Sequence, residues 1–175
     1  MEFKNGGESE DYSIAISPAR YLNSLNALAN VEAHNELNAY KEALDQNTIV
    51  SATDRKGIIK YANNQFCKIS GYSREELIGQ NIKILNSSYH ERDFFAELWR
   101  KISSGLPWRG EIRNQSKHGD FYWVDTTIVP RRNHFGKIDG YVSIRYDITA
   151  RKATESKLLS EVERRNNTEE LLKEI

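Results

Sequence analysis

Apolar and polar residues alternate along residues 108–147, and this alternation predicts three consecutive strands. In the first of them, Trp108 and Asn114 fall on one face while charged side chains fall on the other, which is the period of two of a half-buried strand. Aromatic and β-branched residues dominate the other two, and glycine-containing breaks separate all three. The pattern therefore predicts an antiparallel meander. Its strands are expected at residues 108–115, 121–130 and 138–147.

Two more strands and three short helices are predicted before this meander. Residues 48–54 and 57–62 flank a turn that contains Gly57, which favours a second hairpin. Ser73 and Glu76 have the spacing of a helix capping box. The short helices are expected at residues 63–71, 73–79 and 89–104. This order places helices on one face of a five-stranded antiparallel sheet, so the predicted fold class is α+β.

Longer helices are predicted on both sides of this core. Ser17 and Pro18 have the residue types of an N-cap and a first helical position, and an apolar stripe follows that includes Leu28 and Leu37. The stripe either packs on the chain's own domain or forms a parallel dimer with a second copy. We thus expect a disordered leader at residues 1–17, an N-terminal helix at 18–45, a folded domain at 46–149 and a C-terminal linker helix at 150–175.

Composition narrows the classes of partner. The chain has 175 residues, with 25 Lys+Arg balanced by 25 Asp+Glu, so it lacks the basic charge that nucleic acids or anionic membranes attract. We expect neither a nucleic-acid partner nor direct membrane contact, because no apolar run approaches the length of a membrane span. The one cysteine, Cys67, cannot form an internal disulfide, which favours a reducing, cytoplasmic location.

Four groups of residues between Leu44 and Lys152 follow a family pattern. They are Thr53-Asp54, Gly57, Ile59, Tyr61-Ala62-Asn63 and Phe66; Ser70-Gly71-Tyr72, Glu75-Glu76-Leu77 and Gly79; Lys117, Gly119 and Tyr122-Trp123; and Asp147-Ile148-Thr149. In identity and order they resemble the PAS family of sensory domains. The resemblance implies a PAS fold and a role in signal transduction, with an output domain on the C-terminal side. It also implies that Asp147 and Thr149 relay the signal, because in PAS proteins this motif is the usual hinge before the output helix.

A second set of residues occupies the middle of the chain. It comprises Asn81, Ile84-Leu85, Phe95, Leu98-Trp99, Gly105, Pro107-Trp108, Gly110, Asn114 and Lys117. This set is similar to the flavin-binding PAS domains of bacterial redox and aerotaxis sensors, which implies a bound FAD and a sensor of redox potential or oxygen. Many similar domains have no known ligand. The alternative is therefore a ligand-free dimerisation and relay module upstream of a histidine kinase or a cyclic-dinucleotide enzyme.

Asn114 is the first candidate for ligand binding, because the strand period places its amide on the apolar face. A buried amide without a hydrogen bond costs about 1–3 kcal/mol. Asn114 either caps a neighbouring loop or bonds another buried group or, as the resemblance implies, pairs with the edge of a flavin pyrimidine ring. Trp99 and Trp108 either stack on a planar ligand or pack in the core. Ser51 and Asn81 are further candidates for the same pocket.

Other chemistry is not expected. Light-sensing flavin PAS relatives carry an adduct-forming cysteine and a second pairing asparagine where this chain has Ile82 and Val124, so adduct photochemistry is excluded. The spacing around His90 does not resemble that of haem PAS sensors, and the other histidines do not form a metal-ligand pattern. The chain also lacks catalytic motifs, and we do not expect this fragment to be an enzyme.

A parallel homodimer is also expected, because one small domain cannot cover both the apolar stripe of residues 18–45 and the apolar residues of 150–175. Its expected interface comprises the N-terminal helix and the outer face of the PAS sheet, where period two places Phe121 and Trp123. In the PAS family this outer face often packs against the N-terminal helix or a second protomer. The expected partners are therefore a second copy of the chain and a C-terminal output domain.

Overall fold

The computed structural model describes residues 18–173, so the predicted leader at residues 1–17 lies outside the described residues. The chain divides into two units, Met1–Lys41 and Glu42–Ile175. Helix α1 (Pro18–Asn47) forms the described part of the first unit and continues into the second. It ends at Asn47 rather than at residue 45, because the backbone and hydroxyl of Thr48 both donate to the Leu44 carbonyl and close the last turn.

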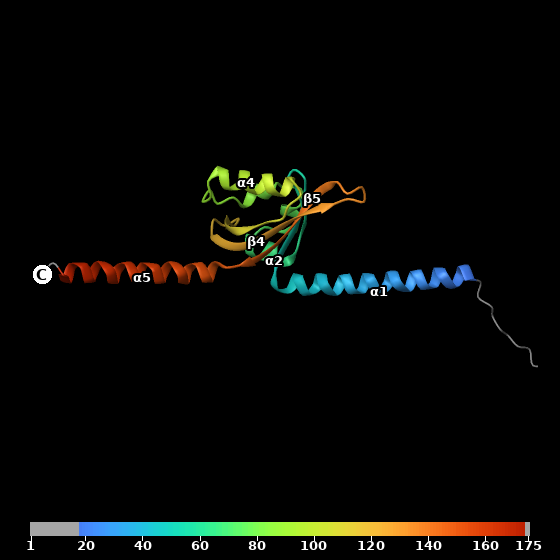
Figure 1. Cartoon of the computed structure of the whole chain (residues 1–175), viewed down its shortest axis with the longest axis horizontal. Helices are drawn as coiled ribbons and strands as arrows, with labels where there is room; N and C mark the ends of the chain where they lie inside the picture. The colour runs from blue at the N-terminus through green and yellow to red at the C-terminus, as the bar shows by residue number, and fades with distance from the viewer. Residues whose placement is uncertain (1–17, 174–175) are drawn as a thin grey trace, which may run out of the picture. The chain divides into compact units, whose positions relative to one another are not determined.

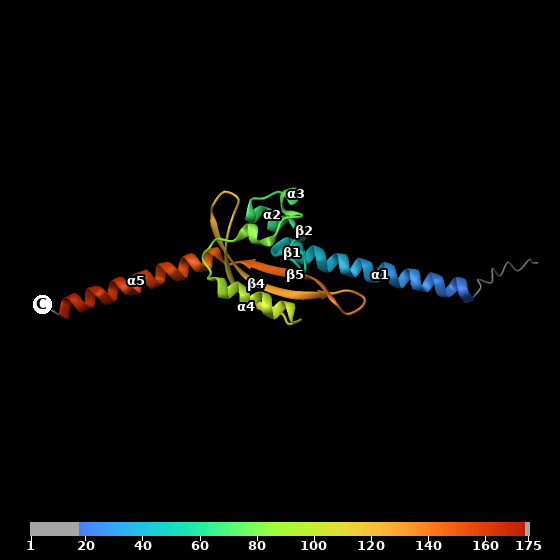
Figure 2. The same ribbon diagram turned by 90° about the horizontal axis from the view of Figure 1, so that it is seen from above.

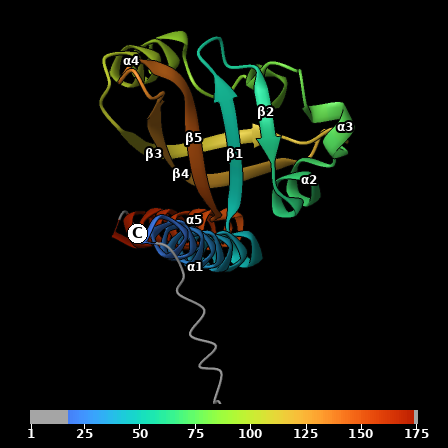
Figure 3. The same ribbon diagram turned by 90° about the vertical axis from the view of Figure 1, so that its right-hand side faces the viewer.

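A five-stranded antiparallel sheet organises the second unit, as the sequence predicts. The strands are β1 (Ile49–Asp54), β2 (Ile59–Ala62), β3 (Trp108–Gln115), β4 (Phe121–Arg132) and β5 (Ile138–Asp147). Their order across the sheet is β2-β1-β5-β4-β3, and Figure 3 shows β5 beside β1. The N-terminal hairpin thus joins the C-terminal meander through the β1–β5 pair, which places both strand groups in one sheet.

The helices between β2 and β3 cover one face of this sheet. They are α2 (Asn64–Ser70), α3 (Arg74–Leu77), the 3₁₀ helix η1 (Ile82–Leu85) and α4 (Arg92–Ser103). Ser73 and Glu76 form the predicted capping box of α3. Helix α4 contacts β3 and β4, and α2 contacts β1 (Figures 1 and 2). The predicted α+β class, with short helices on one face, is therefore confirmed.

The core lies between the sheet and these helices. Its fully buried members include Ile59, Phe66, Leu77 and Ile102, with Val124 on the sheet. On β4 and β5 the buried face also carries polar residues, because alternate positions turn inward. The buried polar residues of these two strands are Thr126, Ser143 and Arg145. The interior is therefore polar along the middle of the sheet and apolar beneath the helices.

Helix α5 (Thr149–Lys173) begins directly after β5 (Figure 2). On α1, Leu28 and Leu37 are 60% and 65% exposed. Leu158 and Leu159 of α5 are also exposed. The predicted homodimer stays a prediction, although these apolar positions are the ones that it would cover. None of the helices in the described part of the chain is long and apolar enough to cross a membrane.

Candidate functional site

A cavity of about 570 Å³ lies between α4 and the inner face of the sheet, within the usual size range of small-molecule sites. Its helical wall is largely apolar but includes the cations Lys83 and Arg92, and its sheet wall is mixed. Helix α4 contributes Arg92, Phe95, Ala96, Leu98, Trp99 and Ile102, and the sheet contributes Thr53, Ile112, Asn114, Ile128, Tyr141, Ser143 and Arg145. An apolar wall that faces a polar one suits a flat ligand whose polar groups lie along one edge.

Asn114 occupies the predicted position on the inner face of β3. It is 8% exposed and lines the cavity. Its backbone forms an isolated bridge with Asn86, and across the strand pair it faces Tyr122. The Tyr122 hydroxyl is buried, and interaction with the Asn114 side chain opposes the rise that burial causes in the pKa of Tyr122. The Asn114 side chain therefore lies on the cavity wall beside this phenol, within the lining that a bound molecule would contact.

Arg145 lies on β5 and lines the same cavity. It is 5% exposed, and its Nη1 donates to the Ser51 hydroxyl at 2.9 Å. Burial lowers the pKa of the Arg145 guanidinium to about 10, and Tyr122 opposes this shift. Burial also raises the pKa of Tyr122 to about 12, so this phenol stays protonated and Arg145 stays charged near neutral pH.

Trp99 lines the cavity, as predicted, whereas Trp108 does not. Trp99 makes an edge contact with Tyr141 at 5.6 Å between ring centroids. Trp108 is buried in the core and packs edge-on against Phe94 at 5.6 Å. A side chain at Gly110 would meet the Trp108 indole at 2.6 Å, so this glycine allows the ring to lie along β3. Trp108 is thus on the predicted face, but its ring packs in the core.

Ser51 and Asn81 are also absent from the cavity wall. Ser51 is fully buried and lies behind Arg145, and its hydroxyl accepts a hydrogen bond from the Arg145 guanidinium. Asn81 caps η1 by accepting from the backbone of Lys83, and its Nδ2 donates to the Lys56 carbonyl. Ser51 can therefore influence a ligand through Arg145. The side chain of Asn81 instead forms hydrogen bonds that stabilise the turn before η1.

His90 braces the edge of the sheet. Its Nε2 accepts from the backbone N–H of Arg113 at 2.8 Å, and its ring stacks on Phe94 at 4.2 Å. The Ser87 hydroxyl donates to the Arg113 carbonyl, so both backbone groups of Arg113 are satisfied at this outer edge. Burial lowers the pKa of His90. No group of His, Cys, Asp and Glu among the described residues could hold a metal ion.

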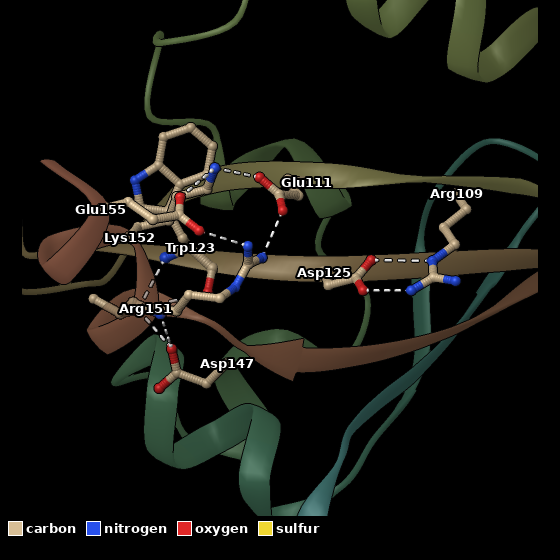
Figure 4. Close-up of polar contacts among 9 residues, drawn as sticks. Arg109, Glu111, Trp123, Asp125, Asp147, Arg151, Lys152 and Glu155 are labelled. Carbon is tan, nitrogen blue, oxygen red and sulfur yellow. Dashed lines mark hydrogen bonds and ion pairs between the residues drawn. The ribbon is translucent and has the colours of Figure 1, made fainter. Parts of the chain in front are cut away.

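One backbone and one side-chain hydrogen bond join the β5–α5 junction to Trp123 of β4. Thr149 Oγ1 accepts from the Trp123 N–H at 3.0 Å, and the Ile148 N–H donates to the Trp123 carbonyl at 2.9 Å. Asp147 Oδ1 accepts from the Thr149 N–H and hydroxyl. Figure 4 shows Asp147 and Trp123 around this junction. The first residues of α5 thus extend the β4–β5 ladder with side-chain hydrogen bonds.

The first turn of α5 is also tied to β3 by charge. Glu111 forms ion pairs with Arg151 at 2.6 Å and with Lys152 at 2.5 Å, and Glu155 bonds the same two cations (Figure 4). The Lys152 ammonium lies 5.1 Å from the Trp123 ring centroid. Hydrogen bonds from Lys152 and Arg151 lower the pKa of Glu111. The first turn of α5 is therefore bound to the outer face of the sheet at β3 and β4.

Sequence reasoning did not single out Arg145 or Tyr122. On β5 the conspicuous alternation is that of Val142, Ile144 and Tyr146, but in the structure the intervening residues are the buried ones. The strand period of two could have identified Arg145 as a residue of the cavity wall. It places Arg145 on the same face of β5 as Tyr141 and Ser143, which also line the cavity.

Comparison with known proteins identifies the class. A PAS domain family model matches residues 46–150, and the chain belongs to this family. The crystal structure of the PAS domain of a protein from Colwellia psychrerythraea superposes with a TM-score of 0.58 at 28% identity, covering 65% of this chain and 98% of that one. An RNA-binding Light-Oxygen-Voltage receptor gives a TM-score of 0.62 at 22% identity, over 72% of this chain and 37% of that one, and shows the fold alone.

Two curated relatives are signalling proteins by name. The nitrogen fixation regulatory protein of Klebsiella pneumoniae is 37% identical over 109 residues, which are 62% of this chain and 22% of the relative. The aerotaxis receptor of Escherichia coli strain K12 is 40% identical over 101 residues, which are 58% of this chain and 20% of the relative. The chain thus spans about a fifth of the length of these relatives, and it is a sensory PAS domain.

Proposed function

We propose that this PAS domain binds FAD in the cavity beneath α4 and senses redox potential or oxygen. One observation carries the proposal: the Asn114 amide lies on the mixed sheet wall of a cavity whose opposite wall, formed by α4, is largely apolar. An amide offers a donor and an acceptor together, as the pyrimidine edge of an isoalloxazine requires. Trp99 and Phe95 supply flat apolar surface on the helical side.

The relatives support a ligand-responsive role. One is named an aerotaxis receptor and another a nitrogen fixation regulatory protein, and the sequence resembles flavin-binding PAS domains. A bound flavin would supply reversible electron uptake. The chain's own residues then have three tasks: Asn114 orients the ligand, Arg145 provides positive charge, and α4 excludes water from the apolar wall.

The signal leaves through α5. The Thr149 and Ile148 bonds to Trp123, and the Glu111 ion pairs, connect α5 to the strands that form the cavity wall. A shift of β3 or β4 on ligand reduction would therefore change the position in which α5 is held against these strands. We propose that this helix leads to an output module in a longer, dimeric protein, because PAS domains themselves are generally not catalytic.

FAD uptake by the purified protein tests the proposal. Apoprotein titrated with FAD should show saturable quenching of flavin fluorescence. Asn114→Ala should weaken FAD binding by about tenfold or more, because one lost hydrogen-bonding pair costs about 1.5 kcal/mol or more when its partner is left buried. Gln115→Ala is the matched control, since Gln115 is the next residue of β3 and donates to the Gly119 carbonyl outside the cavity.

A wild-type protein that takes up no FAD would refute the cofactor, and the ligand-free relay module would then be the function. Equal FAD affinity of the Asn114→Ala and wild-type proteins would instead refute the placement of the ligand. Unfolding curves of both variants serve as the control for loss of structure. Redox sensing itself requires that α5 become more or less protected from amide exchange when bound FAD is reduced.

A further inference from the structure

The cavity wall contains a buried cation that the described residues leave without an anion. Arg145 donates to the neutral Ser51 hydroxyl, and its guanidinium carbon lies 5.4 Å from the Phe66 ring centroid. None of the described carboxylates forms an ion pair with it. A guanidinium has five N–H donors, and burial without acceptors is unfavourable for a charged group.

The surroundings of Arg145 are rich in donors. Residues that line the cavity include Asn114, Lys83 and His90, and aspartate and glutamate are absent from its described lining. The Thr126 hydroxyl, which lies opposite Arg145 on the paired strand, is buried without a hydrogen-bond partner and can donate as well as accept. Lys83 and Arg92, at the helical side, add further positive charge to the same cavity. The cavity therefore favours a ligand that is negative, or becomes negative, on its polar edge.

We infer that Arg145 stabilises the negative charge of reduced flavin and so raises the midpoint potential of the bound cofactor. The inference rests on the proposed function. An external reductant such as dithionite, itself oxidised to sulfite, would supply two electrons, and solvent would supply one proton, so that oxidised flavin becomes the anionic reduced form. The proton would join the ring system, and the remaining negative charge would spread over the pyrimidine ring. That ring is the part that Asn114 would hold beside Arg145.

Replacement of the cation provides the first test. FAD-loaded wild-type protein, Arg145→Met and Arg145→Lys are titrated reductively beside a reference dye, with flavin absorbance as the readout. Arg145→Met should weaken binding of reduced FAD, relative to oxidised FAD, by about tenfold, which lowers a two-electron potential by about 30 mV. Arg145→Lys should retain most of the potential because it retains the charge. Arg131→Met is the control, since Arg131 is exposed and bonds Asp139 instead.

The second test uses the wild-type protein alone. The midpoint potential of the bound FAD is measured against pH. Uptake of one proton with two electrons makes this potential fall by about 30 mV per pH unit, whereas uptake of two protons makes it fall by about 59 mV per pH unit. The slopes of the FAD-loaded protein and of free FAD are compared in the same buffers, below the Arg145 pKa of about 10, because free reduced flavin is itself anionic in alkaline buffer and takes up its second proton only as the pH falls. Tyr122, with a pKa of about 12, stays protonated throughout.

The outcomes are separable. A slope near 30 mV per pH unit in buffers where free FAD gives about 59 mV, and a potential lowered in Arg145→Met but not in Arg131→Met, support the inference. A slope near 59 mV, or equal potentials in wild type and Arg145→Met, overturn it while FAD binding stands. Wild-type protein that binds no FAD overturns the proposed function instead. If Arg145→Met fails to fold, the wild-type slope and the Arg145→Lys potential still decide the question.

Discussion

Thr149→Val removes the hydrogen bond that joins α5 to β4 while it preserves the shape of the side chain. In the wild type, Thr149 Oγ1 accepts from the Trp123 N–H at 3.0 Å, and its hydroxyl donates to Asp147. Valine cannot accept, so the half-buried Trp123 N–H loses its partner. A lost neutral hydrogen bond costs about 1 kcal/mol, and an unsatisfied buried donor costs about 1–3 kcal/mol. Because water can reach a half-buried group, we expect about 1–2 kcal/mol of destabilisation.

The assay is urea unfolding with linear extrapolation, with the wild type and Thr149→Val compared at equal m-value. Thr154→Val is the matched control, because Thr154 lies on the same helix and its hydroxyl only donates to the Ala150 carbonyl one turn earlier. Amide exchange at Trp123 should also accelerate in Thr149→Val alone. Equal stability of the two valine variants, with Trp123 exchange unchanged, would refute the view that Thr149 fastens α5 to the sheet.

Three further predictions concern the relay and the dimer. Glu111→Gln should lower stability by about 0.2–1 kcal/mol at pH 7, since its ion pairs are partly exposed. The folded-state pKa of Glu111 is lowered, so this contribution is complete above its unfolded pKa and is lost as pH falls through the folded pKa. Urea curves of the two proteins should therefore differ at pH 7 and converge in acid, below the folded pKa. Asp147→Ala in the longer protein should uncouple stimulus from output while circular dichroism stays native, and intact regulation would contradict the relay. Leu28 and Leu37 are exposed on α1, so replacing both with Asn should shift light-scattering mass from dimer toward monomer, and a wild-type monomer at micromolar concentration would exclude the dimer.

Local sequence signals predicted the elements because their causes are local. Ser73 and Glu76 lie three residues apart, and that spacing is enough to cap α3. Gly71 ends α2 in the left-handed conformation, with φ of 73°. Local signals did not predict the 3₁₀ helix η1, because it spans only four residues and its N-cap, Asn81, is held by a contact with the distant Lys56 carbonyl. Such short elements lack a period that a sequence can display.

Period two also placed Asn114 correctly on the inner face of β3. The same period could not tell where along that face a side chain would lie. Trp108 shares the face but packs against Phe94 in the core, whereas Trp99 reaches the cavity from α4. Ser51 lies behind Arg145 because β1 pairs with β5, a pairing between residues that are far apart in the chain.

The sequence by itself determined the fold class, the family resemblance and the direction in which Asn114 points, since these follow from strand period, caps and short motifs. Only the tertiary structure decided what surrounds Asn114. The β2-β1-β5-β4-β3 order brings Arg145 beside Ser51 and into the same cavity wall as Asn114. Burial of a charge and its lack of a carboxylate depend on every element packed around it, and a one-dimensional pattern does not carry that information.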